Sequence, residues 1–373
     1  MGEQGAQTAT NQVTDTYKLI IDSNVWGGAE AFAHLGDVDI RSHEHITREA
    51  VQHIDALITR SSTRANVSLL AGSSVRFIGT ATVGDDHVDK DYLKQQGITF
   101  VSAAGSSTQS VVEYMLAVFF TLENIGKLSF SKDKVGIVGV GRIGSTLNQA
   151  CNKLGFKALL NDPPKGLNTN LDEVLETADI LTLHTPLTHD GKHATHHLIG
   201  EKELSKFKGK GIINAGRGAC VDNQALLDWL NQDVEHFAVL DCWEDEPNIH
   251  LDLLNHAQVL IATPHIAGHS LDGKSANTYY VYKDLCDFLQ ASSTWDMQAA
   301  LPDVAVGTLS SNMSKSELAL AMYPIENDNQ AMKQAGKTDN FKAWFSSYRK
   351  NYPVRRAWDK VLAMHNLDKG MFF

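Results

Sequence analysis

The amino-acid sequence predicts an α/β protein with two parallel β-sheets, the second of them doubly wound. Short apolar segments that read as strands alternate with helical segments from residue 17 to about residue 290. This alternation is typical of parallel sheets with crossover helices. A glycine cluster, Gly139-Val140-Gly141-Arg142-Ile143-Gly144, directly follows the apolar segment 134–138. A glycine-rich turn between a strand and a helix is characteristic of the doubly wound class.

The first sheet is predicted from four apolar segments in the N-terminal part of the chain. These predicted strands are 17–22, 56–60, 75–80 and 97–101, with a helix over 26–35. Residues 1–16 are polar and rich in glycine, glutamine, threonine and asparagine. We therefore expect a disordered lead there, with no signal peptide.

The second sheet is predicted to follow a long helix over 110–128, in which apolar residues recur at helical spacing. Its predicted strands are 134–138, 157–162, 180–184, 211–214, 237–241 and 259–262. The pattern then becomes helical to about residue 290, and 291–294 reads as a linker. Residues 301–373 form a separate region with aromatic residues of its own.

Composition limits the classes of function. The chain has 373 residues and a formal net charge of −11 at pH 7, which argues against general binding of nucleic acid or an anionic membrane. No segment approaches the roughly 20 apolar residues of a membrane span. Cys151, Cys220, Cys242 and Cys286 lie far apart, without zinc spacing. We expect four reduced, buried thiols in a cytoplasmic protein.

The glycine cluster is expected to bind the pyrophosphate of a dinucleotide. Gly139 permits the tight turn out of the strand, Gly141 lets the backbone approach the pyrophosphate, and Gly144 lets the helix pack closely on the sheet. The start of the helix then faces the anion. Asp162 ends the next predicted strand. A carboxylate there binds ribose hydroxyls and favours NAD over NADP, although Asp162 also fits a turn into the prolines at 163–164.

Three residues at predicted strand ends have the chemistry of a hydride transfer. Arg217 follows the strand 211–214, Glu246 lies in the acidic turn after 237–241, and His265 follows 259–262. An imidazole can take a hydroxyl proton, and a carboxylate partner fixes its tautomer. A guanidinium can bind a substrate carboxylate in bidentate fashion. Each residue alone could have a purely structural role, as a capping arginine, a solvated acidic turn or a hydrogen-bonded histidine. Their combination at the strand ends of one sheet favours an active site.

Five further histidines raise the possibility of a metal site. They crowd one predicted loop: His184, His189, His193, His196 and His197. Their spacing matches no zinc pattern well and the loop reads as exposed. We therefore expect solvated histidines and no bound metal.

These motifs resemble the D-2-hydroxyacid dehydrogenase family over roughly residues 17–290. The resemblance rests on the segments 135–144, 214–218, 241–247 and 264–268. It implies that Arg217, Glu246 and His265 are catalytic and that NAD is the cofactor. The implied cofactor contacts are Gly139, Gly141, Arg142, Ile143, Gly144, Asp162, Thr185, Ala215, Gly216, Arg217, Asp241 and Gly268.

Within the family, four features are similar to one subfamily, which acts on a small phosphorylated 2-hydroxy acid in vitamin B6 synthesis. They are 58–61 together with 77–82, then 111–114, then 161–164, and 348–352 together with 355–358. The resemblance implies a flavodoxin-like substrate (lid) domain over 17–109 and 267–290. It also implies a Rossmann NAD-binding domain over 110–266 and a small α+β domain over 291–373 that joins a homodimer.

The implied substrate contacts are Ser61 and Thr82. The phosphate requires cations, and Arg60 is the first candidate, with Arg349 a second. Three positions depart from the expected pattern. Residues 104–107 read Ala-Gly-Ser-Ser where the family has Pro-Gly-Cys-Asn. His269 stands where a tyrosine is expected and can still donate a hydrogen bond to phosphate, and Asp85 adds an acid to the loop after Thr82.

Two alternatives remain open from the sequence. One is another D-2-hydroxyacid dehydrogenase, for example one that uses 3-phosphoglycerate. The other is an NAD(H)-sensing scaffold that keeps the catalytic residues without turnover. The sequence contains no basic or disordered interaction tail that favours the scaffold.

Overall fold

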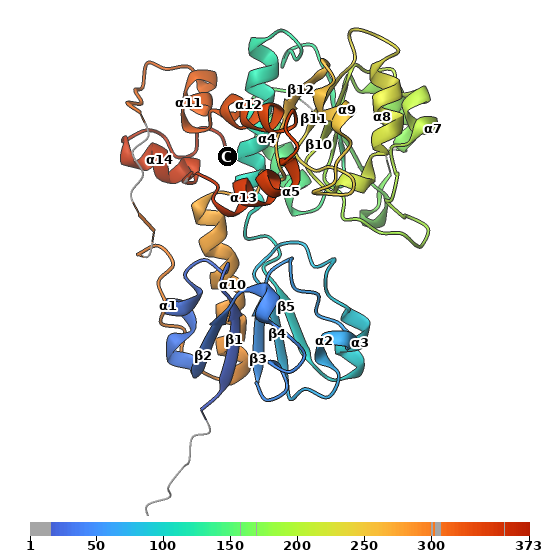
Figure 1. Cartoon of the computed structure of the whole chain (residues 1–373). Coiled ribbons are helices and arrows are strands. Elements are labelled where there is room, and N and C mark those ends of the chain that lie inside the picture. Colours follow the sequence, from blue (N-terminus) through green and yellow to red (C-terminus); the bar gives the residue numbers. More distant parts are fainter. Residues whose placement is uncertain (1–15, 157, 169, 300, 303–306, 354) are drawn as a thin grey trace, which may run out of the picture. The chain divides into compact units, whose positions relative to one another are not determined.

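The computed structural model describes residues 16–156, 158–168, 170–299, 301–302, 307–353 and 355–373 (Figure 1). The expected disordered lead, apart from residue 16, lies outside them. The chain divides into two compact units. The first contains the residues up to 102 together with 278–295, and the second contains 103–277 and 296–373. In the part described, no helix is long and apolar enough to cross a membrane.

The first unit is built on a five-stranded parallel sheet in the order β2-β1-β3-β4-β5. Its strands are β1 (Lys18–Asp22), β2 (Asp37–Arg41), β3 (Ala56–Thr59), β4 (Phe77–Thr80) and β5 (Thr99–Ser102). Every residue of β3 and β4 is buried, as expected for central parallel strands covered on both faces. The four predicted strands are confirmed, and the edge strand β2 was missed because its sequence, DVDIR, is polar and largely exposed.

Short helices surround this sheet. They are α1 (Gly28–Phe32), α2 (Val67–Leu70), α3 (Lys90–Gln95) and the three-residue turns η1 (Ala33–Leu35) and η2 (His43–His45). The second half of α10 (Leu271–Leu289) packs against β4. Its Phe288 ring lies 5.2 Å from the ring of Phe77, and a Cβ added at Gly79 would overlap Val281. Gly79 therefore allows the helix to approach the sheet.

The second unit contains a seven-stranded sheet in the order β12-β11-β10-β9-β6-β7-β8. Its strands are β6 (Val135–Val138), β7 (Ala158–Asp162), β8 (Leu167–Asn168), β9 (Ile180–Leu183), β10 (Gly211–Asn214), β11 (Phe237–Leu240) and β12 (Val259–Ala262). All pairings are parallel except β7 with the two-residue strand β8. Strand order reverses between β6 and β9, which are adjacent. Ligands of doubly wound sheets gather beyond the strand ends at such a switch point.

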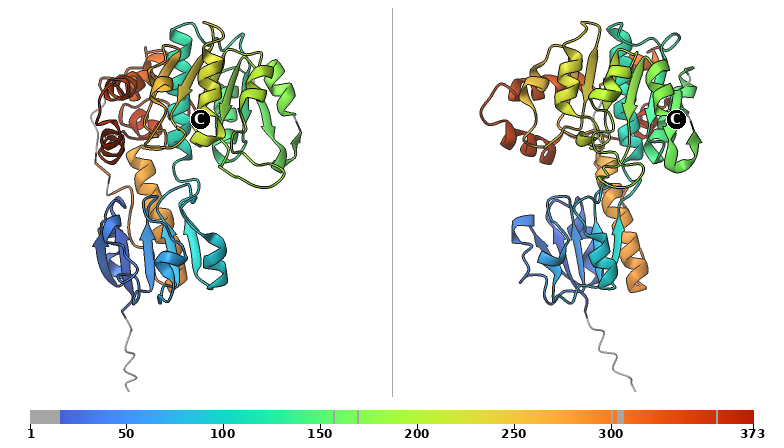
Figure 2. Two further views of the ribbon diagram at one scale, coloured as in Figure 1. Left: turned by 45° about the vertical axis from the view of Figure 1, so that its right-hand side comes forward. Right: turned by 90° about the vertical axis from the view of Figure 1, so that its right-hand side faces the viewer.

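Both faces of this sheet are covered by helices (Figure 2). Side chains along β11 alternate between two cores, with Val239 in one and Ala238 and Leu240 in the other. The first core includes residues of α4 (Thr108–Asn124) and α5 (Arg142–Lys153). The second includes residues of α6 (Leu171–Thr177), α7 (Glu201–Lys206), α8 (Asn223–Leu230) and α9 (Leu251–Asn255). Three-residue turns η3 (Pro163–Lys165) and η4 (Gly218–Cys220) complete the connections.

The C-terminal region packs on the same unit as four helices. They are α11 (Lys315–Met322), α12 (Ile325–Ala335), α13 (Phe341–Lys350) and α14 (Trp358–Met364). No strand occurs among the residues described after 295, so the α+β expectation for this region was wrong for them. The aromatic residues that marked the region recur at helical spacing, with Phe341, Phe345 and Tyr348 on α13.

Candidate active site

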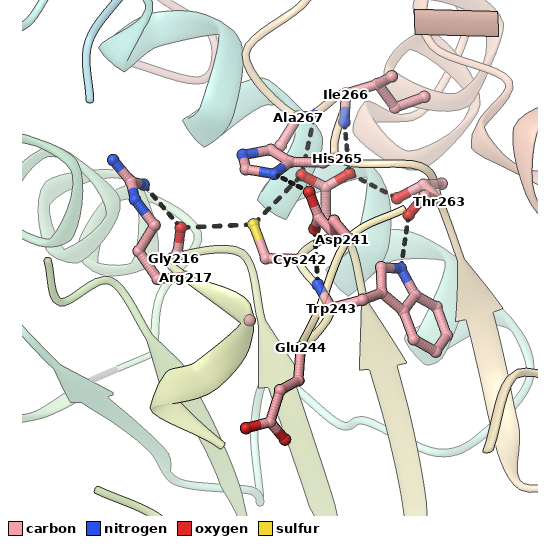
Figure 3. Close-up of polar contacts among 12 residues, drawn as sticks. Gly216, Arg217, Asp241, Cys242, Trp243, Glu244, Thr263, His265, Ile266 and Ala267 are labelled. Carbon is pink, nitrogen blue, oxygen red and sulfur yellow. Dashed lines mark hydrogen bonds and ion pairs between the residues drawn. The ribbon is translucent and has the colours of Figure 1, made fainter. Parts of the chain in front are cut away.

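The three residues proposed for hydride-transfer chemistry follow neighbouring strands of the second unit. Arg217 follows β10, Glu246 follows β11 and His265 follows β12, and these strands are adjacent in the sheet. Carboxyl ends of parallel strands meet at one edge, so the loops after them are brought together. Figure 3 shows Arg217 and His265 beyond the strand ends. Arg217 and Cys242 both contact the Gly216 carbonyl, and Asp241 binds the amides of Ile266 and Ala267, which follow His265.

His265 and Glu246 form a hydrogen-bonded pair. The Nδ1 atom of His265 lies 2.8 Å from Oε2 of Glu246, and Oε1 of Glu246 accepts a hydrogen bond of 2.7 Å from the Trp243 amide. Burial opposes ionisation of Glu246, but the charge and hydrogen bond of His265 and the charge of Arg349 outweigh it, so its pKa is lowered. An ionised Glu246 makes Nδ1 the donor. Nε2 of a neutral His265 is then left as a proton acceptor.

The loop that carries His265 is held by the buried carboxylate of Asp241. Oδ1 of Asp241 accepts hydrogen bonds from the Thr263 hydroxyl and the Ile266 amide, both at 2.7 Å. Oδ2 accepts one from the Ala267 amide at 3.1 Å. His265 has a φ of 55°, a conformation that a non-glycine residue keeps only where its surroundings enforce it. These bonds enforce it, so Asp241 sets the direction of the imidazole.

Arg217 is joined to the same network. Its Nη1 donates to the Gly216 carbonyl at 2.8 Å, and the Cys242 thiol lies 3.3 Å from that carbonyl. The loop after β10 also interlocks with the loop after β11, because a Cβ at Gly218 would overlap the Trp243 carbonyl. The guanidinium is thus placed by two loops that fit only with glycine at 218.

Two groups of described residues have the composition of a metal site. The ligand atoms of Cys242, Glu246 and His265 lie within 4.8 Å of one another, as do those of His196, His197 and Glu244. Burial, together with the charges of Asp241 and Glu246, raises the pKa of the Cys242 thiol well above its usual value. A protonated thiol is a poor ligand, and Glu246 and His265 already bond one another. The geometry therefore favours an acid–base pair over a metal centre.

The glycine cluster forms an open cradle at the start of α5. Gly139 has a φ of 88°, and a Cβ there would lie 2.7 Å from the backbone of His184. A Cβ at Gly141, in contrast, would meet no atom within 4 Å, and no side chain caps the first turn of α5. Open space in front of uncapped amides is what a pyrophosphate requires. The cluster therefore fits NAD.

The other predicted cofactor residues lie near this cradle or at neighbouring strand ends. Asp162 ends β7, and its Oδ2 accepts a hydrogen bond of 2.8 Å from the Val140 amide. Thr185 follows β9, and its amide is one of the atoms that a Cβ at Gly139 would meet. Ala215 and Gly216 follow β10. The cofactor roles of Arg142, Ile143, Gly144 and Gly268 stay predictions. The contacts that the structure shows for the Asp241 carboxylate are those with the loop of His265.

Comparison with known proteins agrees with this geometry. Residues 108–267 match the family model described as D-isomer specific 2-hydroxyacid dehydrogenase, NAD binding domain. The protein curated as erythronate-4-phosphate dehydrogenase in Proteus mirabilis is 38% identical over 92% of this chain and 94% of its own length. The chain belongs to the erythronate-4-phosphate dehydrogenase family. Relatives of the same name from Hydrogenovibrio crunogenus and Chromohalobacter salexigens are 38% and 37% identical over 93% and 95% of both chains.

Solved structures of more distant proteins show the same fold. The D-lactate dehydrogenase of Aquifex aeolicus, complexed with NAD and lactic acid, has a TM-score of 0.60 at 24% identity, covering 73% of this chain and 95% of that one. The NAD-bound 3-phosphoglycerate dehydrogenase of Entamoeba histolytica has a TM-score of 0.62 at 20% identity, over 74% and 95%. These structures confirm the Rossmann fold. The family model and the curated relatives confirm the family resemblance and NAD as cofactor.

The predicted substrate residues of the erythronate-4-phosphate dehydrogenase family fall in both units. Arg60, Ser61 and Thr82 belong to the first unit, and His269 belongs to the second. Arg60 donates from Nη1 to the Asn24 carbonyl at 3.0 Å, and Ser61 is exposed. The His269 ring lies 5.9 Å from that of Tyr352.

The C-terminal segment contributes contacts that sequence reasoning did not predict. Nη2 of Arg355 donates to the Ala267 carbonyl at 3.3 Å, and the Arg355 carbonyl accepts from the Leu271 amide at 2.7 Å. The Asp272 carboxylate binds the guanidinium of Arg356. These contacts support the segment after His265 from a part of the chain about 90 residues away. The motif at 355–358 could be recognised in the sequence, but the residues that it contacts could not.

The histidines of the loop after β9 are not all solvated, and the prediction was wrong for His184. His184 is buried, its Nε2 lies 3.0 Å from the Thr182 hydroxyl, and burial lowers its pKa to about 4. His197 lies 2.5 Å from Glu244 through Nε2. His189, His193 and His196 are exposed as expected. His184 directly follows the buried strand β9, and its position after an apolar run indicates this burial.

Protonation of His184 is expected to destabilise the second unit in acid. Because its folded pKa lies below the ordinary value of 6.5, its contribution is complete above pH 6.5 and falls as the pH drops towards 4. The variant H184Q should lack this loss. When the pH is lowered from 7.5 to 5, the unchanged protein should lose about 2 kcal/mol more of its free energy of unfolding than H184Q loses. Urea unfolding at both values measures it, and H193Q, at an exposed position, should show no such shift.

Proposed function

We propose that this protein oxidises the 2-hydroxyl of 4-phospho-D-erythronate to (R)-3-hydroxy-2-oxo-4-phosphooxybutanoate. NAD would serve as oxidant, and the reaction would belong to pyridoxine 5′-phosphate (vitamin B6) biosynthesis. The hydrogen-bonded His265–Glu246 pair at the edge of the second sheet carries this proposal. The names of the curated relatives support the choice of substrate.

The catalytic roles follow from the geometry of the second unit. NAD, when bound, supplies the oxidant that takes hydride from C2 of the acid. His265 takes the hydroxyl proton at Nε2, because Glu246 holds the other ring nitrogen as a donor. The Glu246 carboxylate also stabilises the imidazolium that results. Arg217 binds the C1 carboxylate with its guanidinium. C2 loses hydride, O2 loses a proton, and the 2-oxo acid is released.

We assign binding of the rest of the substrate to residues of the first unit and to basic side chains. Ser61 and Thr82 would contact the acid, Arg60 and His269 its phosphate. Arg349 is a further cation near the site, since its charge contributes to the lowered pKa of Glu246. We also propose the functional division into 17–109 with 267–290, 110–266 and 291–373. The C-terminal motifs support a homodimer through the last of these, in the cytoplasm.

Anaerobic turnover of the purified protein tests the proposal. NAD and, separately, 2-oxoglutarate would be offered as acceptors with 4-phospho-D-erythronate, and production of the 2-oxo acid would be followed. Turnover is expected with at least one acceptor. Turnover of 3-phosphoglycerate instead would keep the reaction class and overturn the substrate. Bound NAD without turnover of any 2-hydroxy acid would favour the sensing scaffold.

A further inference from the structure

A continuous chain of hydrogen bonds ends at Thr82 in the first unit. The Thr82 hydroxyl lies 2.8 Å from the carbonyl oxygen of Gly84 and 2.8 Å from the hydroxyl of Thr80. The Thr80 hydroxyl lies 2.9 Å from Nε2 of His87. Thr80 is fully buried at the end of β4, and Thr82 and His87 are partly buried in the loop that follows.

The number of protons fixes the direction of this chain. A carbonyl only accepts, so Thr82 uses its single hydroxyl proton on Gly84. Thr80 must then donate to Thr82 and has no proton left for His87. The Nε2 atom of His87 is therefore the donor, and the chain runs from His87 to Thr80, to Thr82 and to the Gly84 carbonyl. Thr82 is left with one lone pair and no available proton.

We propose that Thr82 recognises a hydroxyl donor on the substrate, and that Thr80 and His87 are the positioning residues that hold it as an acceptor. A phosphate or carboxylate oxygen accepts hydrogen bonds and would find no donor at Thr82. The fitting group is an alcohol other than the one that is oxidised, such as the 3-hydroxyl of a 2,3-dihydroxy acid. This rests on the proposed function, which makes Thr82 a substrate contact.

The surroundings of His87 support this arrangement. Burial lowers the pKa of His87, against the opposing charges of Asp86 and Asp85, and this favours the neutral ring. The hydrogen bonds of Thr80 and Thr82 then place its proton on Nε2. The loop is fixed on both sides. The Ala65 amide donates to the His87 carbonyl at 3.1 Å, and Lys90 pairs with Asp85 at 3.1 Å. The imidazole is therefore held where it faces Thr80.

The protein also offers matched control variants. Thr80→Val removes the hydroxyl at nearly constant volume, whereas Thr80→Ser retains it. His87→Leu removes the donor, whereas His87→Gln retains a side-chain N–H. Thr59 is the cross-strand neighbour of Thr80 and is equally buried, but its hydroxyl donates to the Gly79 carbonyl and takes no part in the chain. Thr59→Val therefore reports the general cost of a valine at this strand end.

The first measurement is the preference for 4-phospho-D-erythronate over its 3-deoxy analogue, as the ratio of their kcat/KM values. The unchanged protein should prefer the hydroxylated acid. Thr80→Val and His87→Leu should reduce the preference about fivefold, the size of one neutral hydrogen bond, through KM more than kcat. Thr80→Ser, His87→Gln and Thr59→Val should retain it. An equal loss in Thr59→Val, or an unchanged preference in Thr80→Val, would overturn the proposal.

The second measurement does not depend on turnover. Long-range 1H–15N NMR of the histidines, with His87→Gln to assign the signal, reports which nitrogen of His87 carries the proton at pH 8. The proton is expected on Nε2, and a proton on Nδ1 alone would refute the chain. Failure to oxidise 4-phospho-D-erythronate, with His87 protonated on Nε2, would contradict the proposed substrate and leave the acceptor character of Thr82 standing.

Discussion

Replacing His265 with glutamine is expected to lower kcat for oxidation of the 2-hydroxy acid by about 10²–10⁴-fold, the usual contribution of a positioned general base. Glutamine can still donate to Glu246 but has no nitrogen that accepts a proton. Because the NAD cradle lies around Gly139 and Gly141, outside the histidine loop, NAD affinity should change little. Pre-steady-state formation of NADH measures the chemical step, and NAD titration measures binding.

Glu246→Gln is the companion variant. A glutamine can present its amide N–H to Nδ1 of His265 and then favours the wrong tautomer, so kcat should fall while the fold is kept. If H265Q retained most of the activity of the unchanged protein, the proton would have another acceptor, and the role drawn from the 2.8 Å contact would be wrong.

Replacing Arg355 with leucine is expected to destabilise the second unit by about 3–5 kcal/mol, the typical cost of breaking a buried ion pair. Nη1 of Arg355 lies 2.7 Å from Oε2 of Glu113, and the two side chains are 6% and 0% exposed. Without the guanidinium, Glu113 must stay buried beside only neutral donors. Burial raises its pKa to about 7 even with Arg355 present, so the loss should be larger at pH 8, where the carboxylate is ionised, than at pH 6.

Urea unfolding at the two pH values measures this difference. The double variant Arg355→Leu with Glu113→Gln should recover much of the loss, because the buried charge is gone. Arg76→Leu is the exposed control. Arg76 pairs with Asp55 at the same 2.7 Å, but its side chain is 56% exposed, and pairs of that kind contribute about 1 kcal/mol or less. Equal losses of unfolding free energy in Arg355→Leu and Arg76→Leu would show that burial does not increase the contribution of the ion pair to stability.

The central strands were predictable because parallel strands covered on both faces are continuous apolar segments. The structure has β10 and β12 at the predicted bounds, 211–214 and 259–262. The exposed edge strand β2 and the two-residue strand β8 lack that pattern and were missed. Helical spacing in the C-terminal region was present but was not used, which led to the wrong α+β expectation.

The candidate site was predictable to the extent that it is local. Strand ends carry Arg217, Glu246 and His265, and their order along the chain indicated one edge of a sheet. Contacts between distant segments were not predictable in the same way. Arg355 reaches Glu113 across 242 positions of sequence, and no short motif indicates such a partner. The burial of His184 likewise depends on how the surrounding chain packs.

The glycine at 218 has a consequence for how this scaffold can diversify. Since any side chain there would collide with the Trp243 carbonyl, the loops that present Arg217 and Glu246 are interlocked, and neither can change its course without the other. Sequence drift in these loops is therefore restricted, and on the proposed function a new substrate range is more easily acquired through the loops after β3 and β4, which carry the proposed substrate contacts. Descendants of this chain that adopt new acids should differ mainly around Ser61 and Thr82, while their chemistry stays the same.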